Sequence, residues 1–114
     1  MVDRQRIPVA MAEAIAERFR LLAEPTRVRI LDVLREGPLS VGAVTDRIGT
    51  SPQNVSKHLG LLHGAGIVAR EKDGTLVRYR IADPSVFQLC DEVCGGIHRH
   101  LSERQSMMEE AVPR

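Results

Sequence analysis

The segment from Ser51 to Ile81 constrains the fold more than any other part of the chain, because its hydrophobic period changes within a few residues. SPQNVSKHLGLLHGAG has the period of a helix: Ser51 can cap its start, Pro52 suits its first turn, and two glycines favour its end. IVAREK and TLVRYRI then alternate apolar and charged residues, which predicts two strands joined by a turn over residues 72–75. The segment therefore predicts a helix followed at once by a charged β-hairpin.

Three more helices are predicted before this segment, over residues 9–22, 26–34 and 41–48, where apolar residues recur every three or four positions. The second of them is expected to bury Val28 together with Ile30, Leu31 and Leu34. Ser40 can cap the third helix, and a glycine ends it just before the next helix begins. Two consecutive short helices joined by a tight turn predict a helix-turn-helix.

A last helix is predicted to begin after Asp83-Pro84, so the element order is α-α-α-α-β-β-α. This order is typical of a mainly α-helical protein with a small β-hairpin, the winged helix-turn-helix. Residues 9–102 are expected to form this domain, with a flexible arm over residues 1–8 and a frayed tail over residues 103–114. The length of 114 residues suits one compact domain.

Composition excludes several classes of protein. Hydrophobic residues make up 43% of the chain but aromatic residues only 3%, so the core is expected to be aliphatic and small enough to gain stability from a second subunit. Two cysteines form no disulfide framework, and neither a secretion leader nor an apolar run long enough for a membrane span occurs, so we expect a cytoplasmic protein. No catalytic motif is found, so an enzyme is not expected.

The charges point to nucleic acid through their placement, since the net charge is only +1. Between Ser51 and Arg80 the chain carries five cationic side chains and two acidic ones, a local charge of +3. Gln and Asn can form paired hydrogen bonds with adenine, and Ser, Lys and Arg can contact phosphates or guanine. The expected DNA contacts are Gln53, Asn54, Ser56 and Lys57 on the helix and Arg70, Lys72, Arg78 and Arg80 on the hairpin.

Two blocks of the sequence, FRLLAEPTRVRILDVL and LSVGAVTDRIGTSPQNVSKHLGLLHGAGIVAREKDGTLVRYRI, resemble the ArsR/SmtB family of bacterial winged-helix repressors. The similarity extends from about Ala14 to Leu101. Its specific marks are Leu22, Pro25, Thr26, Arg27, Arg29, Ile30, Leu34, Ser51, Val55, Ser56, His58, Leu59, Leu62, Gly66, Val68, Gly74, Tyr79 and Ile81.

The resemblance implies a homodimer built through the first and last helices, with two recognition helices in successive major grooves of a near-palindromic operator. It also implies repression that an inducer, often a metal ion, relieves by lowering the affinity for DNA. Gln53, Asn54, Ser56 and Lys57 match the recognition-helix positions that contact bases or phosphates. The resemblance leaves two roles open for His58, which would face either a phosphate or the protein interior.

Known effector sites of the family match this chain incompletely. A Cys-Val-Cys motif in the third helix is absent, because the corresponding residues read SVGAVTD. A second type of site combines Asp-x-His with His-x-x-Glu on the last helices of two subunits. His100 and Glu103 match its second half, but Phe87 and Leu89 stand where the ligands of the first half would be.

LCDEVCGGIHRH, from Leu89 to His100, contains a different set of candidate ligands on the last helix. Cys90, Cys94 and His98 are spaced four residues apart and therefore follow one stripe of it, whereas His100 points almost opposite to His98. Two thiolates and an imidazole suit Zn(II), Cd(II), Cu(I) or As(III), and Ni(II) is a further candidate. Three interpretations of the stripe stay open: metal binding, a thiol response to oxidants or reactive sulfur, and packing in a dimer seam.

The leading functional hypothesis is a dimeric repressor that a metal ion or another small inducer releases from its operator. A repressor that responds to thiol oxidation or reactive sulfur is the first alternative. The second is a winged-helix module for protein association that has no effector of its own.

Overall fold

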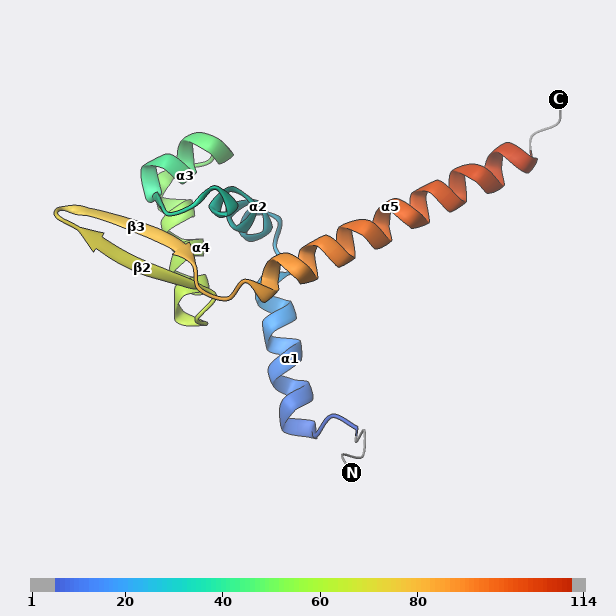
Figure 1. The fold of residues 1–114 in the computed structure, drawn as a ribbon, viewed down its shortest axis with the longest axis horizontal. Coiled ribbons are helices and arrows are strands. Elements are labelled where there is room, and N and C mark those ends of the chain that lie inside the picture. Colours follow the sequence, from blue (N-terminus) through green and yellow to red (C-terminus); the bar gives the residue numbers. More distant parts are fainter. Residues whose placement is uncertain (1–5, 112–114) are drawn as a thin grey trace. The chain divides into compact units, whose positions relative to one another are not determined.

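The structure, a computed structural model, describes residues 6–111 and divides after Asp83 into two units. The first unit contains α1 (Val9–Leu22), α2 (Pro25–Val33), the 3₁₀ helix η1 (Leu34–Glu36), β1 (Leu39–Ser40), α3 (Val41–Ile48), α4 (Pro52–Gly64), β2 (Val68–Asp73) and β3 (Leu76–Ile81), and the second contains α5 (Ser85–Ala111). The predicted winged helix-turn-helix order is confirmed, and η1 and β1 are additions to it (Figure 1).

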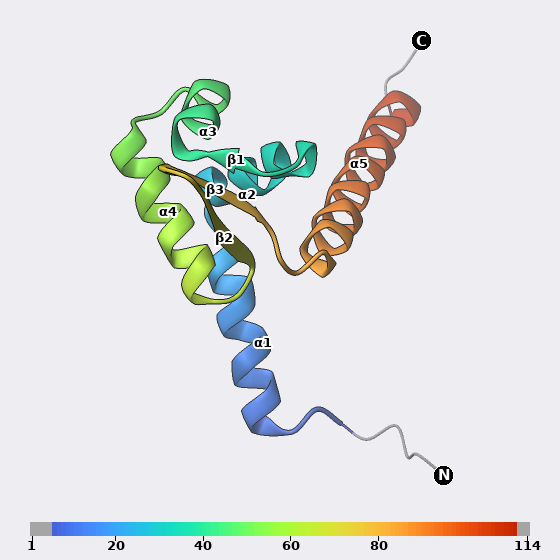
Figure 2. The ribbon, with the colours of Figure 1, turned by 60° about the vertical axis from the view of Figure 1, so that its left-hand side comes forward.

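Two hydroxyl caps define the helix-turn-helix. Ser40 Oγ accepts a hydrogen bond from the backbone N–H of Ala43 at 3.1 Å, and Ser51 Oγ accepts one from that of Asn54 at the same distance. Each bond satisfies a backbone donor that the first turn of a helix leaves free. Gly49 ends α3 with a φ of +82°, a conformation that glycine adopts without strain. These local signals fix the turn between α3 and α4, which follow one another in Figure 2.

A three-stranded antiparallel sheet in the order β1-β3-β2 completes the first unit. β2 and β3 form the hairpin, or wing, which closes at the pair Asp73 and Leu76 with Gly74 in the turn at a φ of +65°. The two residues of β1 pair Leu39 with Tyr79 and Ser40 with Arg78. Ser40 therefore belongs to the sheet and caps α3 at the same time.

The core of the first unit is aliphatic, as its composition predicts. Its buried members are Ile30, Leu31, Leu34, Val44, Ile48, Val55, Leu59, Leu62, Ile67 and Val68, with Tyr79 as the one buried aromatic residue among those described. The prediction that α2 buries Val28 is wrong, because this side chain is 39% exposed. α1 contributes no buried residue, and Figures 1 and 2 both show it extending away from the rest of its unit.

α5 continues to Ala111 and so includes most of the segment from residue 103 for which the sequence predicted a frayed tail. The physical reason is the composition of this segment: Glu, Arg, Gln and Met favour helices, and no proline occurs before Pro113. The predicted N-terminal arm lies outside the described residues over 1–5, and residues 6–8 form neither helix nor strand. No helix in the described range combines the length and apolar character that crossing a membrane requires.

Candidate nucleic-acid interface and effector residues

The exposed side of α4 carries the side chains expected to contact DNA. Gln53, Ser56 and Lys57 are exposed, whereas Val55 and Leu59 on the opposite side are buried in the core. Since α4 starts at Pro52 with its capped turn open to solvent, its backbone N–H groups add partial positive charge at this end. The arrangement suits the insertion of α4 into a DNA groove.

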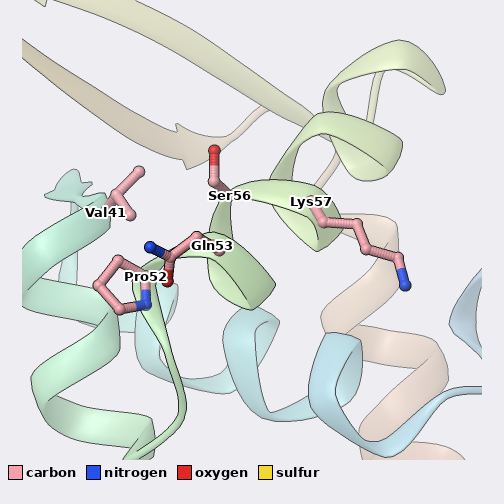
Figure 3. A pocket seen from close by; sticks show the side chains of 5 residues that line it. All are labelled: Val41, Pro52, Gln53, Ser56 and Lys57. Atoms are coloured by element: carbon pink, nitrogen blue, oxygen red, sulfur yellow. The ribbon is translucent and has the colours of Figure 1, made fainter.

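A shallow depression opens where the first turn of α4 meets the first turn of α3. Val41, Pro52, Gln53, Ser56 and Lys57 line it (Figure 3). Figure 3 shows Val41 and Pro52 beside the Gln53 amide, while Lys57 extends away from them. The depression thus has an apolar side, formed by Val41 and Pro52, next to the hydrogen-bonding amide of Gln53. The charged side chain of Lys57 points away from that side.

Asn54 differs from its neighbours because it stabilises the turn. This half-buried residue donates from its side-chain Nδ2 to Thr50 Oγ1 at 3.2 Å, and its backbone N–H is the donor that Ser51 caps. The amide is therefore already engaged within the protein, and among the four α4 residues expected to contact DNA, Asn54 is the least available for a base contact.

The four wing cations fall into two pairs on opposite faces of the hairpin. Arg78 lies 3.8 Å from Asp73 through Nη1 and Oδ2, and Arg80 is hydrogen-bonded to Glu71. Cross-strand partners share a face, so the register that pairs Glu71 with Arg78 places these four residues together. One face of the wing is consequently close to neutral.

Arg70 and Lys72 occupy the other face, which they share with Tyr79 and Val77, their partners in the register. Neither of these cations, nor Lys57, has an ion-pair partner within the described part of the chain. A charge without an internal partner is free to contact a phosphate. The structure thus separates the predicted wing contacts into two unpaired cations and two paired ones.

His58 is buried, at 6% exposure, and so faces the protein interior rather than DNA. Its Nδ1 lies 3.1 Å from Arg27 Nη1, and its Nε2 lies 3.6 Å from Glu24 Oε2. A guanidinium only donates, so Nδ1 is the acceptor and the ring proton resides on Nε2, toward the carboxylate. Of the two roles left open for His58, a DNA contact and a place in the protein interior, the buried position favours the second.

Glu24, Arg27 and His58 form one polar cluster that joins three helices. Glu24 caps α2 by accepting from the backbone N–H of Arg27 at 3.1 Å, and Arg27 Nε donates to the carbonyl oxygen of Leu21 at the end of α1. The sequence contained a signal for His58: it follows Val55 by three residues and precedes Leu62 by four, on the inner stripe of α4. Nothing comparable indicated that Glu24 and Arg27 would contact His58 on α4, or that Arg27 would contact Leu21 on α1.

Replacing Arg27 with methionine is expected to lower the free energy of unfolding by about 1 to 3 kcal/mol, because it leaves partly buried acceptors without a donor. Urea unfolding at a fixed protein concentration measures this change. Arg47→Met is the matched control: Arg47 pairs with the exposed Glu36, and its loss should change stability by about 0.5 kcal/mol or less. Equal losses in both variants would contradict the proposed role of the cluster.

The candidate effector residues lie along α5 in the second unit. Cys90 is half-buried, and Cys94, His98, His100 and Glu103 are exposed. Val93, Ile97 and Leu101 are each more than half exposed and mark an apolar stripe along the helix. At 100° per residue, Cys90 lies about 20° from Ile97, at the centre of this stripe, Cys94 about 60° away and His98 about 100° away.

The two thiols therefore belong to the apolar stripe and its edge, whereas His98 points away from it. His100 lies about 60° from Ile97 on the other side. Nowhere in residues 6–111 do three or more His, Cys, Asp or Glu side chains come together in a way that could hold a metal ion within one chain.

Comparisons with known proteins agree with this architecture. The sequence model of a helix-turn-helix domain family matches residues 22–71. The HTH-type transcriptional regulator Rv0081 of Mycobacterium tuberculosis is 38% identical over 96 residues, which span 83% of this chain and 84% of Rv0081. Its crystal structure superimposes with a TM-score of 0.75 at 37% identity and covers 87% of this chain and 98% of Rv0081.

Two further solved structures share the fold. The antimony-specific transcriptional repressor AntR has a TM-score of 0.78 at 32% identity, over 90% of this chain and 93% of AntR. The homodimeric winged helix-turn-helix DNA-binding domain of Mb0332 from Mycobacterium bovis has a TM-score of 0.74 at 29% identity, over 90% of this chain and 95% of that domain. The similarity thus extends through both units.

Proposed function

Because the chain belongs to the ArsR/SmtB family of winged helix-turn-helix transcriptional regulators, we propose that it is a dimeric repressor whose operator affinity falls when a soft metal ion binds. One observation carries the DNA-binding part of this proposal. Lys57 on α4 and Arg70 and Lys72 on the wing are exposed and unpaired among the described residues, and α4 presents Gln53 in its capped first turn. Such a surface suits phosphate contacts around a base-contacting helix.

Dimerisation is supported by the apolar surface that one chain leaves in water. Met11 and Phe19 on α1 are half exposed, and Val93, Ile97 and Leu101 follow one side of α5. Exposed apolar surface of this extent is typical of an interface between subunits. We assign the dimer interface to α1 and α5, and the homodimeric Mb0332 domain provides a precedent for the assembly. Two recognition helices would then contact half-sites about one turn of DNA apart.

The effector proposal depends on the position of the thiols in this interface. A two-fold contact uses the same surface of both chains, so thiols in or beside the stripe of one α5 would approach ligands of the other. Cys90 and Cys94 would supply the sulfur ligands, and His98, His100 or Glu103 of either chain would complete the coordination. Thiolates favour Zn(II), Cd(II) and As(III) over hard ions, and AntR, 32% identical to this chain, is specific for antimony. We place the protein in the cytoplasm, where conditions keep both thiols reduced.

We expect Zn(II), Cd(II), arsenite or antimonite to release the reduced protein from its operator, in a titration followed by fluorescence anisotropy. Cys90→Ser and Cys94→Ser should bind the operator as the parent does and resist release, because each lacks a thiolate. Gln88→Ala on the same helix is the control that should respond like the parent. Release that persists unchanged in both serine variants would exclude the thiols as ligands.

A thiol-responsive repressor is the second candidate, and the exposure of Cys94 beside half-buried Cys90 favours it. A bond between the two within one helix is strained, since four residues rise roughly 6 Å along the axis. A disulfide or a longer sulfur chain between subunits avoids this strain. If only a persulfide donor or an oxidant releases the operator, with a cross-linked dimer on non-reducing gels, this candidate replaces the metal-responsive one.

A third outcome concerns DNA itself. A repressor binds its operator with an affinity that falls steeply as salt rises. Weak binding without preference for any sequence would instead indicate a winged-helix module for protein association.

A further inference from the structure

We infer that the depression between α3 and α4 accommodates the C5-methyl group of a thymine, so that each operator half-site contains a thymine recognised by its methyl. This inference rests on the proposed DNA-binding function and specifies the base chemistry of the same surface. It assigns a specificity-determining role to Val41 and Pro52, two residues that sequence reasoning did not associate with DNA.

The apolar side of the depression has chemistry that matches one feature of the major groove. The side chains of Val41 and Pro52 carry neither a hydrogen-bond donor nor an acceptor, so they cannot recognise the polar edges of the bases. Thymine alone among the four bases presents an apolar group in the major groove, its C5-methyl. A surface of this kind, next to a helix that enters the groove, favours thymine.

The polar members of the depression determine how a base pair would lie against it. Figure 3 shows the Gln53 amide beside Val41 and Pro52, and a glutamine amide can form paired hydrogen bonds with N6 and N7 of adenine. Lys57 extends away from Val41, and its ammonium group suits a phosphate contact. Gln53 and the apolar pair therefore suit an adenine and a neighbouring thymine methyl.

Local structure holds the apolar pair in place before DNA binds. Val41 is the first residue of α3, directly after Ser40, which caps the helix and pairs with Arg78 in the sheet. Pro52 is the first residue of α4, and its ring restricts its own φ. A contact surface that is already ordered loses little conformational entropy on binding. Removal of one buried methyl should weaken binding about fourfold, and removal from both half-sites about fifteenfold.

The experiment starts with operators selected by the full-length protein from randomised duplexes. Each thymine of the selected operator is then replaced by deoxyuracil, which lacks only the methyl, at symmetric positions in both half-sites. We expect one symmetric pair of replacements to raise Kd about fifteenfold in the parent. The same replacement should raise Kd clearly less in Val41→Ala, because the methyl then keeps Pro52 but loses most of its contact with residue 41.

Val28→Ala, a change of the same size on the exposed side of α2, is the matched control and should retain the full response to deoxyuracil. Val41→Thr keeps the shape of the side chain and tests the apolar character alone; it should reduce the response as Val41→Ala does. Thermal unfolding checks that all three variants are folded. Their DNA affinities are compared at one salt concentration.

Two results would overturn the inference while the proposed function stands: no deoxyuracil replacement changes Kd by more than about twofold, or Val41→Ala keeps the parent's full response. The first excludes methyl recognition, and the second assigns it to another part of the protein. Selection that yields no preferred sequence would instead overturn both the inference and the proposed function.

Discussion

A variant with Lys57, Arg70 and Lys72 all replaced by alanine should lose at least about a thousandfold in operator affinity. A dimer carries six of these cations, and each phosphate contact contributes about 0.9 to the slope of log K against log salt concentration, so the slope should become shallower by about five. Fluorescence anisotropy titrations at several salt concentrations measure both quantities. The effect is large because none of the three cations has a protein partner among the described residues.

The matched control removes two cations that are already paired. Arg78 and Arg80 form ion pairs with Asp73 and Glu71. For each charge removed, the variant with both arginines replaced by alanine should therefore change the slope of log K against log salt concentration far less than the triple variant does. A loss of affinity in the control as large as in the triple variant would show that the ion pairs open on binding. The assignment of DNA contacts to one face of the wing would then be incorrect.

Replacing Ile97 with glutamate should convert the protein to a monomer and weaken operator binding by about 10²- to 10⁴-fold. Ile97 is 55% exposed in one chain and lies in the centre of the apolar stripe of α5. A carboxylate there would lie in the dimer interface without a partner, which is costly. The two half-sites would then be bound independently, without the gain in effective concentration that a dimer provides.

Sedimentation velocity gives the oligomeric state, and anisotropy gives the affinity for one half-site and for the full operator. Ser102→Glu introduces the same charge about 140° around the helix from Ile97 and should leave both properties close to those of the parent. A dimeric Ile97→Glu protein would locate the interface elsewhere. A monomer that retains full affinity would mean that the operator requires only one chain.

Much of the first unit could be predicted because its signals are local. Ser40 and Ser51 are followed by apolar residues at helical spacing, and each forms the cap that its position predicts. The alternation in the wing likewise defines two strands and their turn. β1 could not be predicted, because two residues carry no period and their pairing partners lie about forty residues away in the sequence.

The roles of individual polar residues were harder to predict than the elements that carry them. His58 belongs to the inner stripe of α4, yet its partners Arg27 and Glu24 come from a different part of the chain. The division of the wing cations into paired and unpaired sets depends on which residues face each other across the hairpin. Such relations follow from the register of the strands and from tertiary packing, which a linear pattern does not contain.

Ser40 is both a strand residue of the wing sheet and the N-cap of α3, and this affects how an inducer bound at α5 could lower the affinity for DNA. One residue holds the first turn of α3 and an edge of the wing sheet, so the wing is tied to α3, and α3 in turn packs against the recognition helix α4. A unit connected in this way resists internal distortion, and an inducer would gain little by deforming it. An inducer could instead change the distance between the recognition helices of the two subunits. Successive major grooves on one side of DNA are a fixed distance of about 34 Å apart. Induction would then change the distance between the two recognition helices of the dimer and leave each DNA-binding unit unchanged. The helices would no longer fit two successive major grooves.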